Sequence, residues 1–329
     1  MKHSKIKYCI VLINVLLISP ELVAQKEGNI WYFGNKAGLD FNSGTPVALL
    51  NGTLSTREGC SAISDNVGNL LFYTDGDTVW NANHIPMPNG FGLMGHPSST
   101  QTALIVQKPN SMNDYYIFTT PSQVSEDGNW GFRYSIVDMT LDGGLGDIAN
   151  KNVLLHDSVT EKLTAVRHAN GCDVWVITHE WDSDRFLVYL VDESSINPAP
   201  VISNIGVIYT GASNRAIGQL KASPDGSKLA LAVTNINQFQ LFDFDNVTGL
   251  VSNPVTFTPP SFSGEYSYGV EFSPDGTKLY GSTGQLPGIY QWNLLAGSST
   301  DIINSETLIG GSDPNSFMGA LQLGPDGKI

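Results

Sequence analysis

The stretch YGVEFSPDGTKLYGST, from Tyr268 to Thr283, places two apolar segments on either side of a four-residue turn. Val270 and Phe272 precede the turn Ser273–Gly276, and Leu279 follows it. Proline fixes the φ angle of the first central residue, aspartate accepts hydrogen bonds from nearby amides, and glycine adopts the positive φ that closes a hairpin. The stretch therefore predicts two antiparallel strands joined by a tight turn, with no chemistry of its own.

The same phrase occurs again in the chain. GQLKASPDGSKLALAV spans Gly218–Val233, and GALQLGPDGKI spans Gly319–Ile329. Weaker copies of the hairpin occupy residues 60–73, 103–118 and 163–177. The turn glycines are 55, 50 and 51 residues apart, at Gly171, Gly226, Gly276 and Gly327. A period of about 50 residues indicates a repeat architecture.

A second pair of strands follows each hairpin. Residues 185–190, 239–244 and 289–294 alternate between apolar and polar side chains, as half-buried strands do. Four short strands per period predict the blade of a β-propeller. A β-sandwich could use the same strands but would not require the period. We therefore expect an all-β fold, a β-propeller of four-stranded blades with six or seven blades in the complete ring, and no amphipathic helix after the N-terminal segment.

The two ends of the repeat region are uneven. Residues 29–50 fit only the second half of a blade, and the last copy stops at Ile329, where the other copies continue into a return strand. We expect a propeller domain over 25–329 that is truncated at the C-terminus, with an incomplete last blade. Either the ring is left open there, or the hairpin at 319–329 completes the blade begun by residues 29–50.

The N-terminal segment has the order of regions found in secretory signal peptides. Lys2, Lys5 and Lys7 precede an apolar run from Tyr8 to Ile18, and Ala24 is a small residue at a cleavage position. The run is shorter than the roughly 20 apolar residues of a membrane span. We predict a signal peptide over 1–24, cleavage after Ala24, and a secreted or cell-surface protein without a membrane span.

Composition narrows the partners. The 329 residues include 17 Lys and Arg against 31 Asp and Glu, a formal net charge of −14. Such a chain repels phosphate backbones, so nucleic acid is not expected as a partner. After the signal peptide only Cys60 and Cys172 are left, and we expect both to be unpaired core residues.

Three segments resemble a known group of proteins: NIWYFGNKAGLDF (29–41), CSAISDNVGNLLFYTDGDTVWNAN (60–83) and GALQLGPDGKI (319–329). They are similar to the N-terminal propeller of large secreted Bacteroidetes surface proteins, and the SPDG units resemble the wider YVTN and WD-repeat superfamily. The resemblance covers nearly the whole chain after residue 24. It implies a propeller within a longer multidomain chain, often with PKD modules and a type IX C-terminal sorting domain, neither of which occurs in this sequence.

No catalytic motif is found. The sequence lacks a G-x-S-x-G elbow, an H-E-x-x-H motif, a phosphate-binding loop and a C-x-x-C pair. His179–Glu180 is read as part of a strand end rather than a metal site, and Asp75–Asp77 as a tight turn rather than a calcium loop. Trp31, Trp80 and Trp175 fall at strand positions and, like Trp292, are expected to pack blades together. We expect no metal and no cofactor.

Geometry suggests where a ligand would bind. In a propeller the innermost strands line a central channel, and the loops that lead into them converge at one face. The polar residues expected there, as candidate ligand-binding residues of this channel mouth, are Arg57, Glu58, Gln101, Glu161, Lys162, Arg215, Gln219, Glu265 and Tyr266. Such a ring suits a small polar ligand or a peptide loop. The alternative is that these are solvated loop residues with no ligand.

Two classes of function follow from these observations. The first is a non-catalytic extracellular binding or scaffold module, with a protein or glycan surface ligand as its partner. The second is a lactonase-like or other hydrolase, which the resemblance to YVTN propellers implies by analogy of fold alone.

Overall fold

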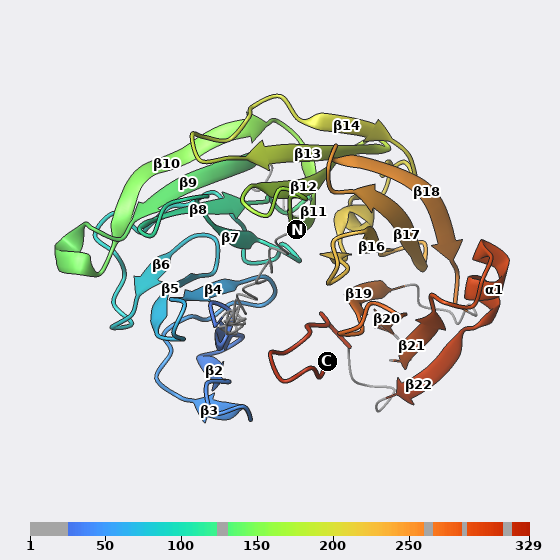
Figure 1. Ribbon diagram of the computed structural model, residues 1–329, viewed down its shortest axis with the longest axis horizontal. Coiled ribbons are helices and arrows are strands. Elements are labelled where there is room, and N and C mark those ends of the chain that lie inside the picture. The colour runs from blue at the N-terminus through green and yellow to red at the C-terminus, as the bar shows by residue number, and fades with distance from the viewer. Residues whose placement is uncertain (1–25, 124–130, 260–265, 285–287, 312–317) are drawn as a thin grey trace, which may run out of the picture.

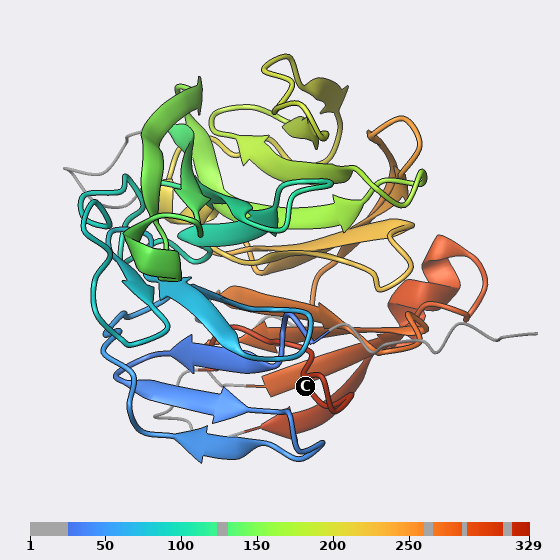
Figure 2. The same ribbon diagram turned by 60° about the vertical axis from the view of Figure 1, so that its left-hand side comes forward.

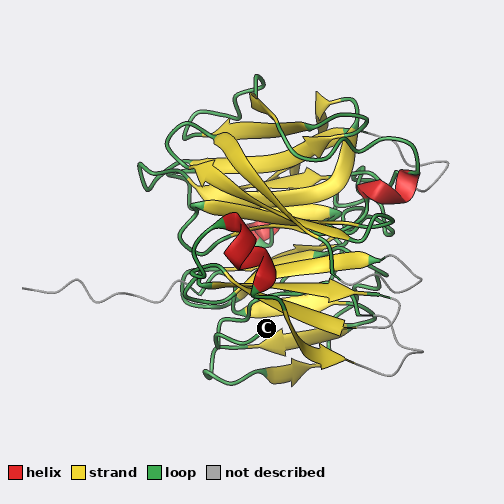
Figure 3. Cartoon of the chain, turned by 90° about the vertical axis from the view of Figure 1, so that its right-hand side faces the viewer, coloured by secondary structure: helices red, strands yellow, loops and turns green. Residues whose placement is uncertain are grey.

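The structure is a computed structural model that describes residues 26–123, 131–259, 266–284, 288–311 and 318–329. Six antiparallel sheets are arranged around a central axis, each contributing its first strand toward the middle (Figure 1). Seen from the side, the sheets stack face to face like the blades of a ring (Figure 3). The predicted all-β propeller is therefore confirmed, with six blades.

Each sheet runs outward in chain order, and consecutive strands pair with each other. The first sheet holds β1 (Ile30–Phe33), β2 (Ala37–Asp40) and β3 (Val47–Leu49). The second holds β4 (Ser61–Ser64), β5 (Leu70–Thr74) and β6 (Val79–Asn81). The third holds β7 (Ala103–Gln107), β8 (Asp114–Thr119), β9 (Phe132–Asp138) and β10 (Asp147–His156). The fourth holds β11 (Val159–Arg167), β12 (Val174–Glu180), β13 (Arg185–Val191) and β14 (Val201–Asn204). The fifth holds β15 (Leu220–Ala222), β16 (Lys228–Val233), β17 (Gln238–Asp245) and β18 (Leu250–Phe257). The sixth holds β19 (Ser267–Phe272), β20 (Lys278–Thr283), β21 (Gly288–Asn293) and β22 (Thr307–Gly311).

The prediction of four strands per blade holds for four sheets, whereas the first two have three. The described residues contain two short 3-10 turns, η1 (Asp142–Gly144) and η2 (Ser213–Ala216), and one six-residue helix, α1 (Ser299–Asn304). A capping box at Ser298 and Asp301 begins α1, which connects β21 to β22. Within the described ranges, the expectation of a fold without amphipathic helices overlooked the short helix α1.

The repeated phrase forms the hairpin that its residues predict. Gly226 and Gly276 both have φ of +68°, and each donates its amide to the serine that begins its turn, over 2.8 Å. The Asp275 side chain accepts hydrogen bonds from the Ser273 hydroxyl and the Thr277 amide. This local network lowers the pKa of Asp275 to about 2, with the Ser273 hydroxyl as the largest cause. The turn is therefore fixed by contacts within the five residues Ser273–Thr277.

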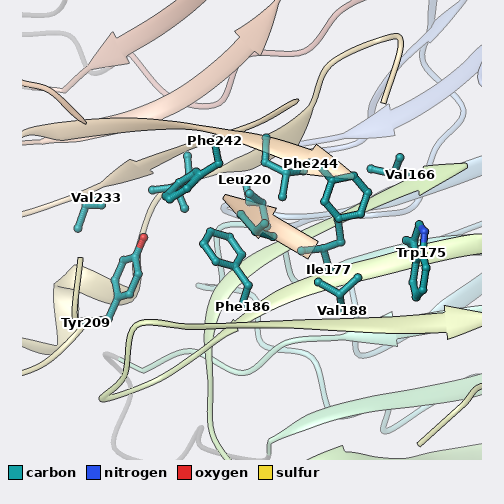
Figure 4. Close-up of a cluster of buried hydrophobic side chains, with 13 residues drawn as sticks. Val166, Trp175, Ile177, Phe186, Val188, Tyr209, Leu220, Val233, Phe242 and Phe244 are labelled. Carbon is teal, nitrogen blue, oxygen red and sulfur yellow. The ribbon is translucent and has the colours of Figure 1, made fainter. Parts of the chain in front are cut away.

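Apolar side chains from facing sheets fill the space between blades. Between the fourth and fifth sheets, Trp175, Phe186 and Phe242 belong to one buried cluster (Figure 4). Phe186 and Phe242 meet edge to face, with ring centroids 4.9 Å apart. Trp292 has the same role between the fifth and sixth sheets, where it packs near Phe257. The predicted packing role of these two tryptophans is confirmed.

The two cysteines differ from each other. Both are free. Cys60 packs against a buried cluster, and burial raises the pKa of its thiol to about 12. Cys172 is exposed, because it lies in the turn between β11 and β12. The expectation of two core residues is therefore wrong for Cys172, since its short apolar side chain sits at a hairpin tip.

The C-terminal segment 318–329 lies between the first sheet and the sixth (Figures 1 and 2). The Ser282 hydroxyl donates to the Gly319 carbonyl over 2.6 Å, and Gly324 lies beside the Phe41 ring. The segment is thus placed at the inner end of the first blade, on the side that faces β19. The expectation of a ring left open at this point is not supported by these contacts, although no strand pairing joins the segment to β1 within the described residues.

Candidate functional site in the central channel

The channel has two different ends. At the loop end lie the residues that lead into the inner strands, among them Glu58, Gln101, Glu161 and Gln219. At the turn end lie the tight turns that follow those strands, such as Ser223–Gly226. We describe the loop end first, because the sequence analysis placed the candidate site there.

Glu161 is buried at the loop end, near the start of β11. Its Oε2 accepts hydrogen bonds from the amide and the hydroxyl of Thr100, each over 2.9 Å. Its Oε1 accepts from the Ser122 hydroxyl and the Gln123 amide, each over 3.3 Å. Burial raises the pKa of Glu161 to about 7, and the nearby Glu58 adds to the rise. This carboxyl group is held in place by the chain itself.

Glu58 joins two blades that are far apart in the sequence. One of its oxygens accepts a hydrogen bond from the Ser98 hydroxyl over 3.1 Å, and the other accepts from the Tyr268 hydroxyl over 2.9 Å. Burial raises the pKa of Glu58, and the two hydroxyl groups partly offset this effect. Burial also raises the pKa of Tyr268, as does the neighbouring Glu58. Sequence analysis overlooked Tyr268 and chose Tyr266, which lies just before β19.

Lys162 points away from the channel into the protein. Its Nζ donates to the carbonyl oxygens of Ala216 and Ile217 over 3.0 and 2.9 Å, and it lies 5.0 Å from the centre of the Tyr209 ring. Burial lowers the pKa of Lys162, against the opposing effect of Glu161. A lysine in this position supports the loop that precedes β15 and does not face a channel ligand.

Gln101 and Gln219 bridge neighbouring inner strands. Gln101 Oε1 accepts from the Leu163 amide of β11 over 3.1 Å and from the Leu220 amide of β15 over 2.7 Å. Gln219 Oε1 accepts from the Val270 amide of β19 over 3.2 Å and from an amide of the C-terminal segment, that of Leu321, over 2.9 Å. Each carboxamide therefore satisfies two backbone groups that would otherwise face the channel unpaired.

The other predicted residues of the mouth are dispersed. Arg57 is exposed, Arg215 donates to the Thr210 carbonyl over 3.0 Å, and the carbonyl of Tyr266 accepts the Gly284 amide. Glu265 lies outside the described residues. The structure thus brings together Glu58, Gln101, Glu161 and Gln219 with Tyr268. That the predicted residues bind a ligand stays a prediction.

The turn end carries a polar chain that the sequence analysis did not single out. Lys221, Glu271 and Gln322 occupy the same place in three successive copies of the repeat, two residues before the turn. Lys221 Nζ lies 3.2 Å from Glu271 Oε2 and also donates to Gln322 Oε1. Glu271 Oε1 accepts the Phe272 amide over 2.9 Å, and its Oε2 accepts the Leu323 amide over 3.0 Å. Aligning the three repeat copies in the sequence would have pointed to these three polar residues.

A hollow of about 600 Å³ opens at the turn end, beside this polar chain. It lies between the hairpins of the fourth and fifth blades, and its lining includes Ala165, Arg167, Lys221, Ala222 and Glu271. None of the eight described residues of the predicted loop-end mouth lines it. This hollow therefore lies at the end of the channel opposite to the predicted mouth, and ligand binding at the mouth stays a prediction.

The predicted absence of a metal site concerns His179–Glu180 and Asp75–Asp77. Among the described residues there is no group of three or more His, Cys, Asp or Glu side chains that could hold a metal ion. His179 is buried against the rings of Tyr209 and Phe186, while Glu180 lies near His156 and Arg185. Asp75 Oδ1 accepts the amides of Asp77 and Thr78, which confirms the tight turn predicted there. Nor does any described helix have the length and apolar character to cross a membrane.

Comparison with known proteins identifies the architecture and nothing finer. No protein-family model matches the sequence, and no curated protein sequence matches it. Among solved structures, the hydrazine synthase of Kuenenia stuttgartiensis is similar over 92% of this chain and 88% of its own, with 11% identity and a TM-score of 0.56. A putative 6-phosphogluconolactonase from Bacteroides uniformis is similar over 88% and 82%, with 15% identity and a TM-score of 0.49. The β-propeller domain of Cps50 (Swd1) from Myceliophteria thermophila is similar over 90% and 87%, with 11% identity and a TM-score of 0.49. Of these three, the hydrazine synthase has a TM-score above 0.5, and at 11% identity its likeness shows the fold alone.

Proposed function

We propose that this chain is an exported β-propeller that acts as a non-catalytic binding or scaffolding module outside the cell. The observation that carries the proposal is that polar side chains in the channel are engaged in hydrogen bonds with the protein itself. At the loop end, Glu161 accepts four hydrogen bonds from the chain, and Gln101 and Gln219 hold backbone amides. Side chains engaged in this way position the blades, and a general base or nucleophile would need to be free to reach a substrate.

A binding role also fits the hollow at the turn end. Its volume of about 600 Å³ lies within the range of small-ligand sites, roughly 300–1,000 Å³. A protein or glycan on a cell surface is the proposed source of the ligand. Export rests on the N-terminal order of basic, apolar and small residues, and the place of the propeller in a longer multidomain chain rests on the resemblance described above.

The proposal is tested by asking whether a bound molecule leaves unchanged. The full chain is incubated with panels of lactones, esters and glycosides, and with glycan and peptide arrays, and every retained molecule is recovered and weighed by mass spectrometry. We expect saturable retention without any change of mass. Turnover that disappears in Glu58→Gln or Glu161→Gln, both of which keep the shape of the side chain, would show that the protein is an enzyme.

Export is tested separately. The chain is expressed in a host with a general secretion pathway, and the N-terminus of the secreted protein is sequenced. We expect it to begin at Gln25. Secreted protein that begins at Met1 contradicts the signal peptide but leaves the binding proposal open to its own test.

A hydrolase is the second candidate, and two observations favour it. The first is Glu161, a buried carboxyl whose pKa of about 7 suits a general acid or base near neutral pH. The second is that the described residues include buried side-chain atoms without a hydrogen-bond partner, among them atoms of Thr119, Thr160, Asn214, Arg215, Asn237 and Gln238. Buried polar atoms without partners call for an explanation, such as water or a ligand. The four hydrogen bonds of Glu161 weigh against this candidate.

A further inference from the structure

The inner strands present a row of backbone amides to the channel. The amides of Leu163 and Leu220 point into it, because both donate to Gln101. In an antiparallel ladder every second residue points the same way. The register is regular from Leu163 to Arg167 in β11 and from Leu220 to Ala222 in β15. The amides of Arg167 and Ala222 therefore also face the channel.

In one gap between neighbouring inner segments, two such amides have a hydrogen-bond acceptor. Between β19 and the C-terminal segment, the Glu271 carboxylate accepts the amide of Phe272 with one oxygen and that of Leu323 with the other, over 2.9 and 3.0 Å. Phe272 directly precedes its turn, as Ala222 precedes Ser223. A carboxylate thus bridges the last channel-facing amides of two neighbouring blades.

The equivalent gap between β11 and β15 has no carboxylate at the position that corresponds to Glu271. Arg167 directly precedes the turn at 168–171, so Val166 takes the place that Glu271 has in its strand. Val166 has no polar atom and belongs to the buried cluster between the two blades. Within the described part of the chain, no side chain or loop accepts the amides of Arg167 and Ala222. Both residues line the hollow.

The charges at this place favour an anion. Arg167 is exposed, and its Nη1 makes only a long contact of 3.4 Å with the Gly171 carbonyl, so most of its five N–H donors are left for a ligand. Lys221 also lines the hollow, and its ammonium lies at the Glu271 carboxylate. The carboxylates of Glu271 and Asp225 also line the hollow, and Glu271 is already paired with Lys221. Arg167 and the two free amides are therefore the groups left to hold negative charge there.

We propose that the hollow at the turn end of the channel binds a carboxylate, which accepts the amides of Arg167 and Ala222 and is neutralised by the side chain of Arg167. The inference rests on the proposed binding function and gives it a site and a ligand chemistry. The ligand carboxylate repeats between β11 and β15 what Glu271 does between β19 and the C-terminal segment. It belongs either to a small organic acid or to an acidic side chain of a peptide.

The test compares carboxylates with their neutral amides on the full chain. The probes are succinate against succinamide, and the blocked tripeptide acetyl-Ala-Glu-Ala-amide against its Gln counterpart. Backbone amide shifts of Arg167 and Ala222 are followed by NMR, and affinities by calorimetry. We expect saturable shifts at both amides with at least one carboxylate, and binding about tenfold weaker or absent for its amide. Preference for succinate or for the peptide identifies the source of the carboxylate.

Matched variants locate the site. Arg167→Gln should weaken carboxylate binding about tenfold. Arg185→Gln removes one positive charge from an exposed arginine of β13 and should leave binding unchanged. Thermal unfolding of both variants verifies that they are folded. If a variant does not fold, the NMR experiment on the unmodified protein still tests the proposal.

The possible outcomes distinguish a wrong binding site from a wrong proposed function. If carboxylates and amides bind equally, or if neither shifts Arg167 and Ala222, the site is wrong, while retention of another ligand in unchanged form still supports a binding module. If the carboxylate binds here and another molecule is hydrolysed, the site stands and the non-catalytic function is wrong.

Discussion

Lys221 and Glu271, 50 residues apart in the sequence, occupy the same position in two copies of the repeat, and their charged atoms lie 3.2 Å apart. Their side chains are only 14% and 6% exposed. The same carboxylate also holds one amide of its own strand and one of the C-terminal segment. A single side chain therefore links the fifth blade, the sixth blade and the segment that follows them.

Removal of this carboxylate should destabilise the whole ring. Glu271→Ala leaves Lys221 without its ionic partner and two backbone amides without an acceptor, and we expect a loss of about 2–4 kcal/mol in the free energy of unfolding. Asp243→Ala is the control, because it breaks the more exposed pair with Lys228 and should cost less than about 1 kcal/mol. Urea unfolding measures both. Equal losses would mean that the position of Glu271 in the channel is of no special importance.

The glutamine bridges are open to a similar test. Gln101→Leu keeps the size of the side chain but removes the acceptor of two buried amides, so we expect a loss of about 1–3 kcal/mol. Gln107→Leu, at an exposed position where the side chain makes one bond to the Ser111 carbonyl, should change stability by less than about 0.5 kcal/mol. Denaturant midpoints at constant slope decide the comparison. A variant at Gln101 that is as stable as the parent would return this residue to the list of candidate ligand contacts.

The turn glycines should be sensitive for a purely local reason. A methyl group on Gly276 would meet nothing closer than 4.0 Å, but the residue has φ of +68°. Gly276→Ala should therefore cost about 1 kcal/mol through backbone strain alone, and Gly276→Asn less, since asparagine tolerates this conformation. Gly28→Ala, at an open position without positive φ, is the control. Thermal unfolding that ranks alanine and asparagine equally at 276 would argue against strain as the cause.

Stability should fall in acid because of His179. Burial lowers the pKa of His179 to about 3 from an ordinary value of 6.5, and the charge of Lys162 adds to the effect. Below pH 6.5 the unfolded chain binds a proton that the folded chain excludes, so the contribution of His179 is present above pH 6.5 and is lost as the pH falls toward 3. The slope is at most about 1.4 kcal/mol per pH unit.

The variant His179→Phe isolates this effect. Glu161 acts in the opposite direction, because its raised pKa makes the folded state bind a proton between about 4.5 and 7. Both proteins contain Glu161, so its effect cancels in the difference between them. We expect the variant to gain stability relative to the parent as the pH falls from 6 to 4. Parallel curves would show that His179 does not titrate as its burial implies.

The fold could be predicted from sequence because its determinants are local. Ser273, Pro274, Asp275 and Gly276 form the turn through contacts with each other and their neighbours, so a repeat of these residues indicates a repeat of hairpins. The first two blades were less predictable. After β6 the chain returns through isolated pairings, such as Trp80 with Pro86, instead of a fourth strand. No periodic pattern marks such a connection.

The site was harder to predict because side-chain direction depends on the assembled ring. The sequence placed Glu58, Gln101, Glu161 and Gln219 at one face, and they do meet there. It could not show that Gln101 accepts amides of β11 and β15, since those partners lie 62 and 119 residues away. It also treated Lys162 as a residue of the mouth, whereas tertiary packing turns this side chain toward two carbonyl groups of the loop before β15. The hollow at the turn end arises from the spacing of two blades, which no single stretch encodes.

The position of the C-terminal segment has a consequence for the order in which the protein acquires its structure. Gly324 lies beside Phe41, so contacts there must close a loop of nearly the whole described chain, and Leu321 and Leu323 can bond to Gln219 and Glu271 only after the fifth and sixth blades exist. Closing such a long loop costs entropy before any contact repays it. We therefore expect the first five blades to fold on a ribosome while residues 318–329 are still unsynthesised, and the contacts that join the two ends of the ring to form after them.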